Sequence, residues 1–252
     1  MITLASDFGT PYPAAMKGVV LQRTDARLVD VAHDFPRQDL RAAGFWLREV
    51  LPYFPAAVHL VVVDPGVGTD RAALAIRAGD HALVGPDNGV LLPAARELAA
   101  REGADVEVFE VEYADPASST FHGRDVFAPA AAAIHEEGVE NLHERDDVVP
   151  VEEYQNLRFP EPEIEDGTAV GEVLVVDGFG NVVTNLPGDL LDDREEVVVN
   201  GESAPVAQAY DEVGPNQRLV TVGSHGNVEL AVNRGRGDEE FGVSVGDEIR
   251  IE

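Results

Sequence analysis

The sequence predicts an α/β protein: an N-terminal α/β domain with a central, mostly parallel sheet, followed by a smaller antiparallel β-barrel-like domain. Up to about residue 157, short apolar runs alternate with helical stretches, which is typical of α/β layers. A segment rich in proline and acids follows at 159–167, and only closely spaced β runs come after it. We therefore expect domains at 1–158 and 168–252, joined by a linker at 159–167.

In the first domain the predicted strands are short and rich in Val, Ile and Leu, as strands buried on both faces tend to be. They lie at 2–5, 28–31, 58–63, 73–76, 81–84 and 106–111. Three stretches between them are predicted as helices, because they place apolar residues near helical spacing or are rich in Ala, Leu, Glu and Arg. These helices lie at 39–51, 93–101 and 126–136.

The second domain shows no convincing helix in its sequence. Its short β runs are separated by Gly, Asn and Asp, which favour turns, and this spacing predicts a small antiparallel sandwich or barrel. The runs lie at 172–176, 182–184, 196–199, 218–222, 228–232 and 248–251.

The composition narrows the class of ligand. The 252 residues include 47 Asp and Glu against 18 Lys and Arg, a net charge of −29, yet 44% are apolar, so the chain can fold around a core. Such a charge repels nucleic acids and anionic membranes and favours a small-molecule ligand. Cysteine is absent, which excludes disulfides and thiolate sites.

Charge and hydropathy also suggest where the protein works. No leader and no apolar stretch of roughly 18 residues is visible, which predicts a cytoplasmic protein. Lys17 is the only lysine, and an acidic, lysine-poor chain is typical of a high-salt cytoplasm, where a Debye length of about 3 Å at 1 M limits self-repulsion. We therefore predict a halophilic source.

Acidic residues follow several predicted strands. Asp7 ends the first strand, Asp64 begins a Pro-Gly turn after the third, and Asp87 stands in a similar turn. Open α/β sheets bind ligands at this edge, where a carboxylate can accept both hydroxyls of a ribose. A helix cap or turn aspartate is the simpler interpretation of Asp7 taken alone.

A metal centre is not expected from these residues. His33, Asp34, Asp64, Asp87 and His122 could be combined into a cluster, but the sequence contains no H-x-x-x-H or H-E-x-x-H spacing. The glycine-rich segments also do not match the dinucleotide fingerprint, so we expect no metal and no cofactor.

Seven short motifs occur in a fixed order through both predicted domains. They are DFG at 7–9, MKG at 16–18, DPGVG at 64–68, GPDNG at 85–89, FHGRD at 121–125, DGFGNVVTN at 177–185 and ELAVN at 229–233. Together they resemble the S-adenosyl-L-methionine (SAM) hydroxide adenosyltransferases, adenosine-forming SAM hydrolases related to fluorinases and chlorinases. The resemblance implies a homotrimer whose SAM pocket lies between one subunit's N-terminal domain and its neighbour's C-terminal domain.

The resemblance also implies a reaction. Water attacks the ribose 5′-carbon of SAM in an SN2 displacement and gives adenosine and L-methionine. The matching catalytic positions are Asp64 as proton acceptor, with Arg71 and His122 orienting the water and stabilising its charge. Fluorinase-type enzymes lack a carboxylate at the position of Asp64, so its presence favours water over halide.

Substrate-binding roles follow from the same resemblance. Asp7 would bind the ribose diol, and residues of the second domain would hold the rest of SAM. They are Asp177 and Ser224 for the methionine amino and carboxylate groups, Phe179 and Asn181 for the adenine, and Val232 and Asn233, in the segment 232–235, for backbone contacts to the base. Gln38 replaces the fluorinases' stacking tryptophan and His225 replaces their arginine, so base stacking and carboxylate recognition differ here.

Other functions remain open at this point. The chain could be a binding module for SAM or adenosine without catalysis, a SAM-dependent halogenase, or a nucleoside hydrolase or phosphorylase that releases adenine.

Overall fold

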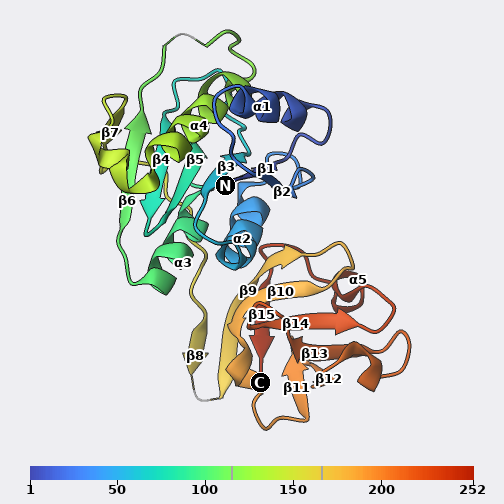
Figure 1. Ribbon diagram of the computed structural model, residues 1–252. Helices are drawn as coiled ribbons and strands as arrows, with labels where there is room; N and C mark the ends of the chain where they lie inside the picture. Colours follow the sequence, from blue (N-terminus) through green and yellow to red (C-terminus); the bar gives the residue numbers. More distant parts are fainter. Residues whose placement is uncertain (115, 166) are drawn as a thin grey trace. The chain divides into compact units, whose positions relative to one another are not determined.

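The computed structural model describes residues 1–114, 116–165 and 167–252, and the chain divides into two compact units, 1–158 and 159–252. The first is a three-layer α/β unit and the second an antiparallel barrel-like sheet (Figure 1). The predicted fold class is confirmed. Among the described helices, none is long and apolar enough to cross a membrane.

The first unit is built on a seven-stranded sheet of order β2-β1-β3-β5-β4-β6-β7. Neighbours from β2 to β5 are parallel, and those from β5 to β7 are antiparallel. The strands are β1 (Ile2–Ser6), β2 (Leu28–Ala32), β3 (Val58–Val62), β4 (Ala73–Ala78), β5 (His81–Pro86), β6 (Val106–Val111) and β7 (Val148–Pro150). The helices are α1 (Tyr12–Leu21), α2 (Leu40–Val50), α3 (Leu92–Glu102) and α4 (Ala128–Glu137).

Helices cover both faces of this sheet. Leu60 of β3 packs with Met16 of α1 and Ala131 of α4, whereas its neighbour Val61 packs on the opposite face with Leu47 of α2. Successive residues of a strand point to opposite faces, so a strand buried on both sides is mostly apolar along its whole length. Figure 1 shows α1 and α4 together on one side of the sheet, with α2 and α3 on the other.

Helix α2 agrees with the predicted helix 39–51, and Asp39 caps it by accepting a hydrogen bond from the Ala42 backbone N–H at 2.9 Å. Helix α1 was not predicted. Proline and glycine interrupt its sequence, and it is stabilised by tertiary packing, since Met16 and Val20 are fully buried against the sheet.

The second unit is an antiparallel sheet of order β12-β11-β15-β9-β10-β14-β13. Its strands are β8 (Glu163–Glu165), β9 (Thr168–Val176), β10 (Val182–Pro187), β11 (Glu196–Val199), β12 (Glu202–Pro205), β13 (Arg218–Val222), β14 (Asn227–Val232) and β15 (Glu248–Ile251). A bridge between Val206, just after β12, and Val220 of β13 brings the two ends of the sheet together and nearly closes a barrel.

Two short elements of this unit differ from the sequence expectation. The segment 159–167, predicted as a linker, contains β8, which pairs with β9; Asp166 of that segment lies outside the described residues. A five-residue helix, α5 (Gly237–Phe241), occurs where no helix was expected. It is too short to show helical periodicity in the sequence.

A buried histidine pair joins β3 to β5 in the first unit. His59 and His81 are stacked, and His59 Nε2 lies 2.9 Å from His81 Nδ1. His59 Nδ1 lies 2.7 Å from Thr3 Oγ1, while His81 Nε2 lies 3.5 Å from Glu102 Oε1. Burial, together with the smaller effect of the neighbouring His81, lowers the pKa of His59 to about 3, and burial also lowers the pKa of His81. Both rings are therefore neutral at pH 7.

This pair makes the stability of the first unit depend on pH. Unfolded His59 takes up a proton near pH 6.5, whereas folded His59 does not until about pH 3, so protons favour the unfolded state between these values. Between pH 7.5 and 5, His59 alone should reduce the free energy of unfolding by about 2 kcal/mol. The free energy of unfolding, measured with urea over this pH range, should depend less steeply on pH in His59→Gln than in wild type. The exposed control, His143→Gln, should keep the wild-type slope; equal slopes in all three proteins would contradict the assignment.

Candidate active site

Two aspartates lie at one edge of the first unit's sheet. Strands β1 and β3 are parallel neighbours with Ser6 opposite Val62, so the residues that follow, including Asp7 and Asp64, leave the sheet at the same edge. Asp7 is 8% exposed, and its Oδ2 accepts a hydrogen bond of 2.7 Å from the Gln38 backbone N–H. That contact fixes the Asp7 carboxylate at the sheet edge.

Asp64, Arg71 and His122 meet at this edge although the first and the last are 58 positions apart in the sequence. Arg71 Nε donates to Asp64 Oδ1 at 2.9 Å, and Arg71 Nη2 donates to Asp64 Oδ2, so the two side chains form a bidentate ion pair. Arg71 Nη2 also lies 2.9 Å from His122 Nδ1. The structure therefore brings together the three residues that the sequence singled out for catalysis.

This group is shielded from water. The side chains of Arg71 and Asp64 are only 9% and 4% exposed, and His122 is buried as well. The Arg71 guanidinium lies 4.9 Å above the ring of Phe127, so an aromatic face covers it. In such surroundings the ion pair is little screened by solvent and holds its geometry.

The protonation of His122 follows from its neighbours. Burial lowers the pKa of His122 below its ordinary value, and the positive charge of Arg71 lowers it further, against the opposing effects of Asp64 and Asp125. The ring is therefore neutral at pH 7. Because Arg71 donates to Nδ1, the proton of the neutral ring must be on Nε2, which leaves His122 with an N–H donor for another partner.

Glycines allow the segments of the site to approach one another. A Cβ on Gly123 would lie 2.8 Å from Met16 Sδ and 3.2 Å from a Val62 methyl group, so glycine lets the residues after His122 pack onto β3. Gly68 has φ of +81°, and a Cβ there would lie 2.8 Å from the Ser119 carbonyl oxygen. The glycines of the 64–68 and 121–125 motifs are thus needed for the shape of the site.

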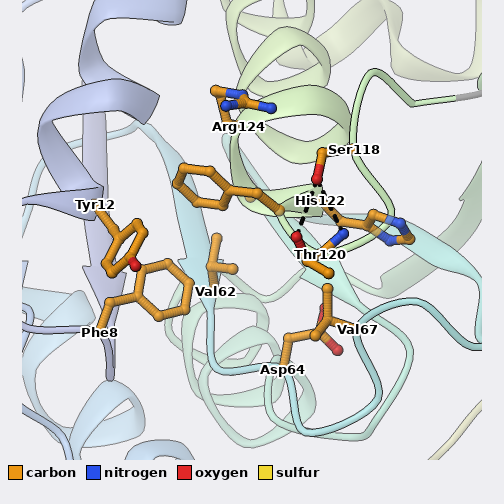
Figure 2. A pocket seen from close by; sticks show the side chains of 11 residues that line it. Phe8, Tyr12, Val62, Asp64, Val67, Ser118, Thr120, His122 and Arg124 are labelled. Atoms are coloured by element: carbon orange, nitrogen blue, oxygen red, sulfur yellow. Dashed lines mark hydrogen bonds between the residues drawn. The ribbon is translucent and has the colours of Figure 1, made fainter.

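A pocket of about 460 Å³ opens beside Asp64 and His122. Its lining includes the rings of Phe8, Tyr12 and Phe121 and the hydroxyls of Ser118 and Thr120, whose oxygens are 3.0 Å apart. Figure 2 shows Phe8 and Tyr12 on the side opposite His122. Arg71 is not among the lining residues, so it contacts the pocket only through its two partners.

Comparison with known proteins identifies the family. One family model, the SAM hydroxide adenosyltransferase N-terminal domain, matches residues 2–144, and the corresponding C-terminal domain matches residues 171–250. The chain belongs to this family. A curated relative from Salinispora tropica, named (R)-S-adenosyl-L-methionine hydrolase, is 42% identical over 99% of this chain and 97% of its own length. A relative of the same name from Thermus thermophilus is 39% identical over 98% of this chain and 97% of its own length.

Two solved structures share the fold of this chain over its whole length. A conserved protein from Thermotoga maritima superposes with a TM-score of 0.84 at 35% identity, and the match covers 100% of this chain and 99% of that one. A conserved hypothetical protein from Thermus thermophilus has a TM-score of 0.76 at 36% identity, with the same coverage. The predicted resemblance to SAM hydroxide adenosyltransferases is confirmed.

The second unit of this adenosyltransferase-family chain holds the other predicted site residues. Asp177 organises the turn after β9: its Oδ1 accepts from the backbone N–H groups of Phe179 and Asn181 at 2.8 and 2.9 Å. Asn181 Nδ2 also donates to Asp177 Oδ2 at 3.1 Å. The ring of Phe179 is 80% exposed at this turn. The turn that Asp177 stabilises thus exposes the Phe179 ring to solvent, an arrangement that suits stacking against a flat ligand.

The other predicted binding residues of the second unit differ in their exposure to solvent. Ser224 is exposed, whereas Val232 is buried. The Asn233 backbone N–H donates to the Gln217 carbonyl at 3.0 Å, and its carbonyl accepts from the Asn216 N–H at 2.7 Å. The backbone donor of Asn233 is therefore already used within the unit.

A partly buried polar network in the second unit links Asn181 and His225 through two residues that the sequence did not single out, Tyr210 and Glu229. Glu229 of β14 is 5% exposed; its Oε1 accepts from Tyr210 at 2.7 Å, and its Oε2 lies 3.6 Å from His225 Nε2. Burial raises the pKa of Tyr210 well above its usual value, and the hydrogen bond to Glu229 adds to this effect. The network connects His225 with the Asp177 turn, because Asn181 Nδ2 lies 3.4 Å from the Tyr210 hydroxyl.

Other candidate residues serve the local structure. Asp87 Oδ1 accepts from the Gln155 backbone N–H at 2.8 Å, and Asn88 Nδ2 donates to the Val63 carbonyl at 2.8 Å, so this turn fastens two segments together. Within residues 1–114, 116–165 and 167–252, no group of three or more His, Asp or Glu side chains is arranged to hold a metal ion.

The sequence analysis assigned no role to several pocket residues. Phe8 and Phe121 belong to the motifs at 7–9 and 121–125, directly beside Asp7 and His122. Their position next to predicted site residues could have indicated that they line the pocket. Arg124 belongs to the same motif as Phe121. Tyr12, Ser118 and Thr120 lie outside the motifs, and their contribution depends on how the loops fold over the sheet edge.

Proposed function

We propose that this chain hydrolyses SAM to adenosine and L-methionine. Its relatives from Salinispora and Thermus named as SAM hydrolases align over nearly their full length, which supports this activity. The observation that carries the proposal is the buried group of Asp64, Arg71 and His122 at the wall of a pocket large enough for a nucleoside. A carboxylate fixed beside a neutral histidine suits the activation of water.

The proposed reaction is an in-line displacement at the ribose 5′-carbon. The oxygen of water forms a bond to that carbon while the carbon–sulfur bond breaks, and the electron pair of that bond goes to sulfur. Methionine leaves as a neutral thioether and so needs no general acid. The water loses one proton, which Asp64 accepts and later releases to solvent. The chemical demand therefore falls on positioning and deprotonating the water.

Each member of the group has a separate task in this proposal. Both oxygens of Asp64 accept from Arg71, but a carboxylate has about four acceptor sites, so it can still bind a water proton. His122 would donate its Nε2–H to the water oxygen. Arg71 is a positioning residue, because it holds both partners while lying outside the pocket lining.

A carboxylate at the reaction centre argues against the halogenase alternative. An anion some 4 Å from Asp64 would be repelled by about 4 kcal/mol by the carboxylate alone at an effective dielectric constant of 20, and the Arg71 guanidinium bonded to Asp64 offsets part of this repulsion. A neutral water molecule is not repelled and can donate a hydrogen bond to the same oxygen. Water is therefore the favoured nucleophile.

The binding roles and the assembly are part of the proposal. Asp7 would accept the ribose hydroxyls, while Asp177 and Ser224 would bind the amino-acid end and the exposed ring of Phe179 would contact adenine together with Asn181. We further propose a cytoplasmic homotrimer in which the pocket is completed by the C-terminal unit of a neighbouring subunit. Light scattering of the purified protein measures its mass, and a monomeric mass would contradict this assembly.

Incubation with SAM in ¹⁸O-labelled water tests the reaction and its site of attack together. Attack at the 5′-carbon should give adenosine and methionine in equal amounts, with the label in the 5′-hydroxyl of adenosine. Chromatography with mass spectrometry measures both products, and a protein-free incubation corrects for spontaneous breakdown of SAM.

Each alternative function predicts a different result in that experiment. Stoichiometric binding without products would indicate a binding module, and free adenine would indicate cleavage of the glycosidic bond. A halogenase would form 5′-halo-adenosine in a parallel incubation with chloride or fluoride. Any of these results would contradict the proposed hydrolysis.

A further inference from the structure

Three aromatic rings form one wall of the pocket. Phe8, Tyr12 and Phe121 pack edge to face, with ring centroids 5.6 to 6.3 Å apart. Tyr12 is 55% exposed at the start of helix α1, whereas Phe8 and Phe121 are half-buried and pack against the core, and all three line the pocket. We refer to these three rings as the aromatic wall.

The aromatic wall already contacts one cation. The Arg124 guanidinium carbon lies 5.1 Å from the centroid of the Phe121 ring. The faces of aromatic rings carry partial negative charge and attract cations, most strongly where water is excluded. The rings of Phe8 and Tyr12 lie on the opposite side of the pocket from His122 (Figure 2).

In-line attack determines which part of SAM faces this wall. The attacking water must lie near Asp64 and His122, about 3 to 3.5 Å from the 5′-carbon, and the sulfur must leave on the far side of that carbon. With the water held at one side of the pocket, the sulfur is directed toward the side that carries Phe8 and Tyr12. The cationic sulfur would then lie against the aromatic wall.

We propose that Phe8, Tyr12 and Phe121 form the subsite for the sulfonium group of SAM, an inference that rests on the proposed function. A trialkyl sulfonium has no N–H or O–H to donate, so ordinary hydrogen bonding cannot recognise it. Aromatic faces are groups that can, and this pocket offers three rings on the side toward which the sulfur is directed.

The subsite has a kinetic consequence. The positive charge on sulfur disappears as the carbon–sulfur bond breaks, so the attraction to the rings is stronger in the bound substrate than in the transition state. Interactions of this kind lower KM without raising kcat. They also favour SAM over methionine, whose thioether is neutral, and so help the product to leave.

Comparison of a charged ligand with a neutral one tests the subsite. KM and kcat would be measured with SAM, and the inhibition constant with S-adenosyl-L-homocysteine, the neutral thioether analogue, for Phe8→Leu and Tyr12→Leu. Leucine keeps the apolar contact but removes the ring. KM for SAM should rise by about 2- to 30-fold, while kcat should not fall in proportion and the inhibition constant should change little.

Two controls accompany these variants. Tyr12→Phe restores the ring and should recover the discrimination between SAM and the thioether. Tyr53→Leu removes an aromatic ring that is 80% exposed outside the pocket and should behave as wild type. S-adenosyl-L-homocysteine also lacks one methyl group. That difference is the same for every variant, so it cancels when the ratio of KM for SAM to the inhibition constant is compared between variants.

The outcomes separate this inference from the proposed function. If the wild type hydrolyses SAM and the leucine variants weaken both ligands equally, the rings contribute only apolar contact and the sulfonium subsite is wrong. If the wild type neither binds nor hydrolyses SAM, the proposed function itself fails. A fall in kcat with unchanged KM would also contradict the subsite.

Discussion

Replacing Asp64 by asparagine is expected to lower kcat for SAM hydrolysis by about two to four orders of magnitude, the usual contribution of a general base. Asparagine keeps the shape of the side chain but cannot accept the proton of water as a carboxylate does. Asp7 and the second unit do not change, so affinity for adenosine should be retained. Initial rates and adenosine titration measure the two quantities separately.

Asp70→Asn is the matched control for this variant. Asp70 lies in the same loop but is exposed and does not line the pocket, so the substitution removes a similar charge without touching the site. Its kcat should stay close to wild type. Thermal unfolding of both variants shows whether each is folded. A folded Asp64→Asn protein with wild-type turnover would remove Asp64 from the role of base.

Replacing Arg71 by methionine should impair both stability and catalysis. It leaves the carboxylate of Asp64, 4% exposed, without its two-bonded partner, and breaking a buried ion pair in this way costs about 3 to 5 kcal/mol. The melting temperature should fall by about 10 °C. Because Asp64 and His122 both lose the hydrogen bonds that Arg71 donates, kcat should fall, whereas affinity for adenosine should not.

Two further substitutions distinguish positioning from simple stabilisation. Arg71→Lys retains the charge but not the planar fork, so it should recover most of the stability and only part of kcat. Arg77→Met removes a surface ion pair with Glu107 in the adjacent strand, 3.3 Å between the charged atoms, and should change stability little. If Arg71→Lys restored stability and kcat together, the fork geometry would have no catalytic role.

Much of the architecture could be predicted from the sequence because local patterns encode it. Strands β1, β3 and β5 are buried throughout and mostly apolar, as burial on both faces of a sheet favours, with Thr3, His59 and His81 among their few polar residues. Helix α2 begins at a capping aspartate, Asp39. Helix α1, by contrast, contains proline and glycine and is stabilised by packing of Met16 and Val20, which no local pattern shows.

The residues of the candidate site could be named from ordered motifs, and the family assignment that those motifs predicted is confirmed. The catalytic roles of Asp64, Arg71 and His122, the homotrimer and the halophilic source stay predictions. The positions of Asp7, Asp64 and Asp87 after predicted strands indicated one sheet edge. They could not show that Asp87 accepts a hydrogen bond from the Gln155 backbone N–H.

Residue type and short-range spacing were enough to predict the fold class, most of the strands and helices, and a set of candidate catalytic and binding residues. Tertiary structure decided which of those residues act together. It placed Arg71 behind Asp64 and His122, fixed the proton of His122 on Nε2, and assembled the aromatic wall from two distant segments. These features depend on distances between side chains remote in sequence, which are set only when the chain folds around the sheet.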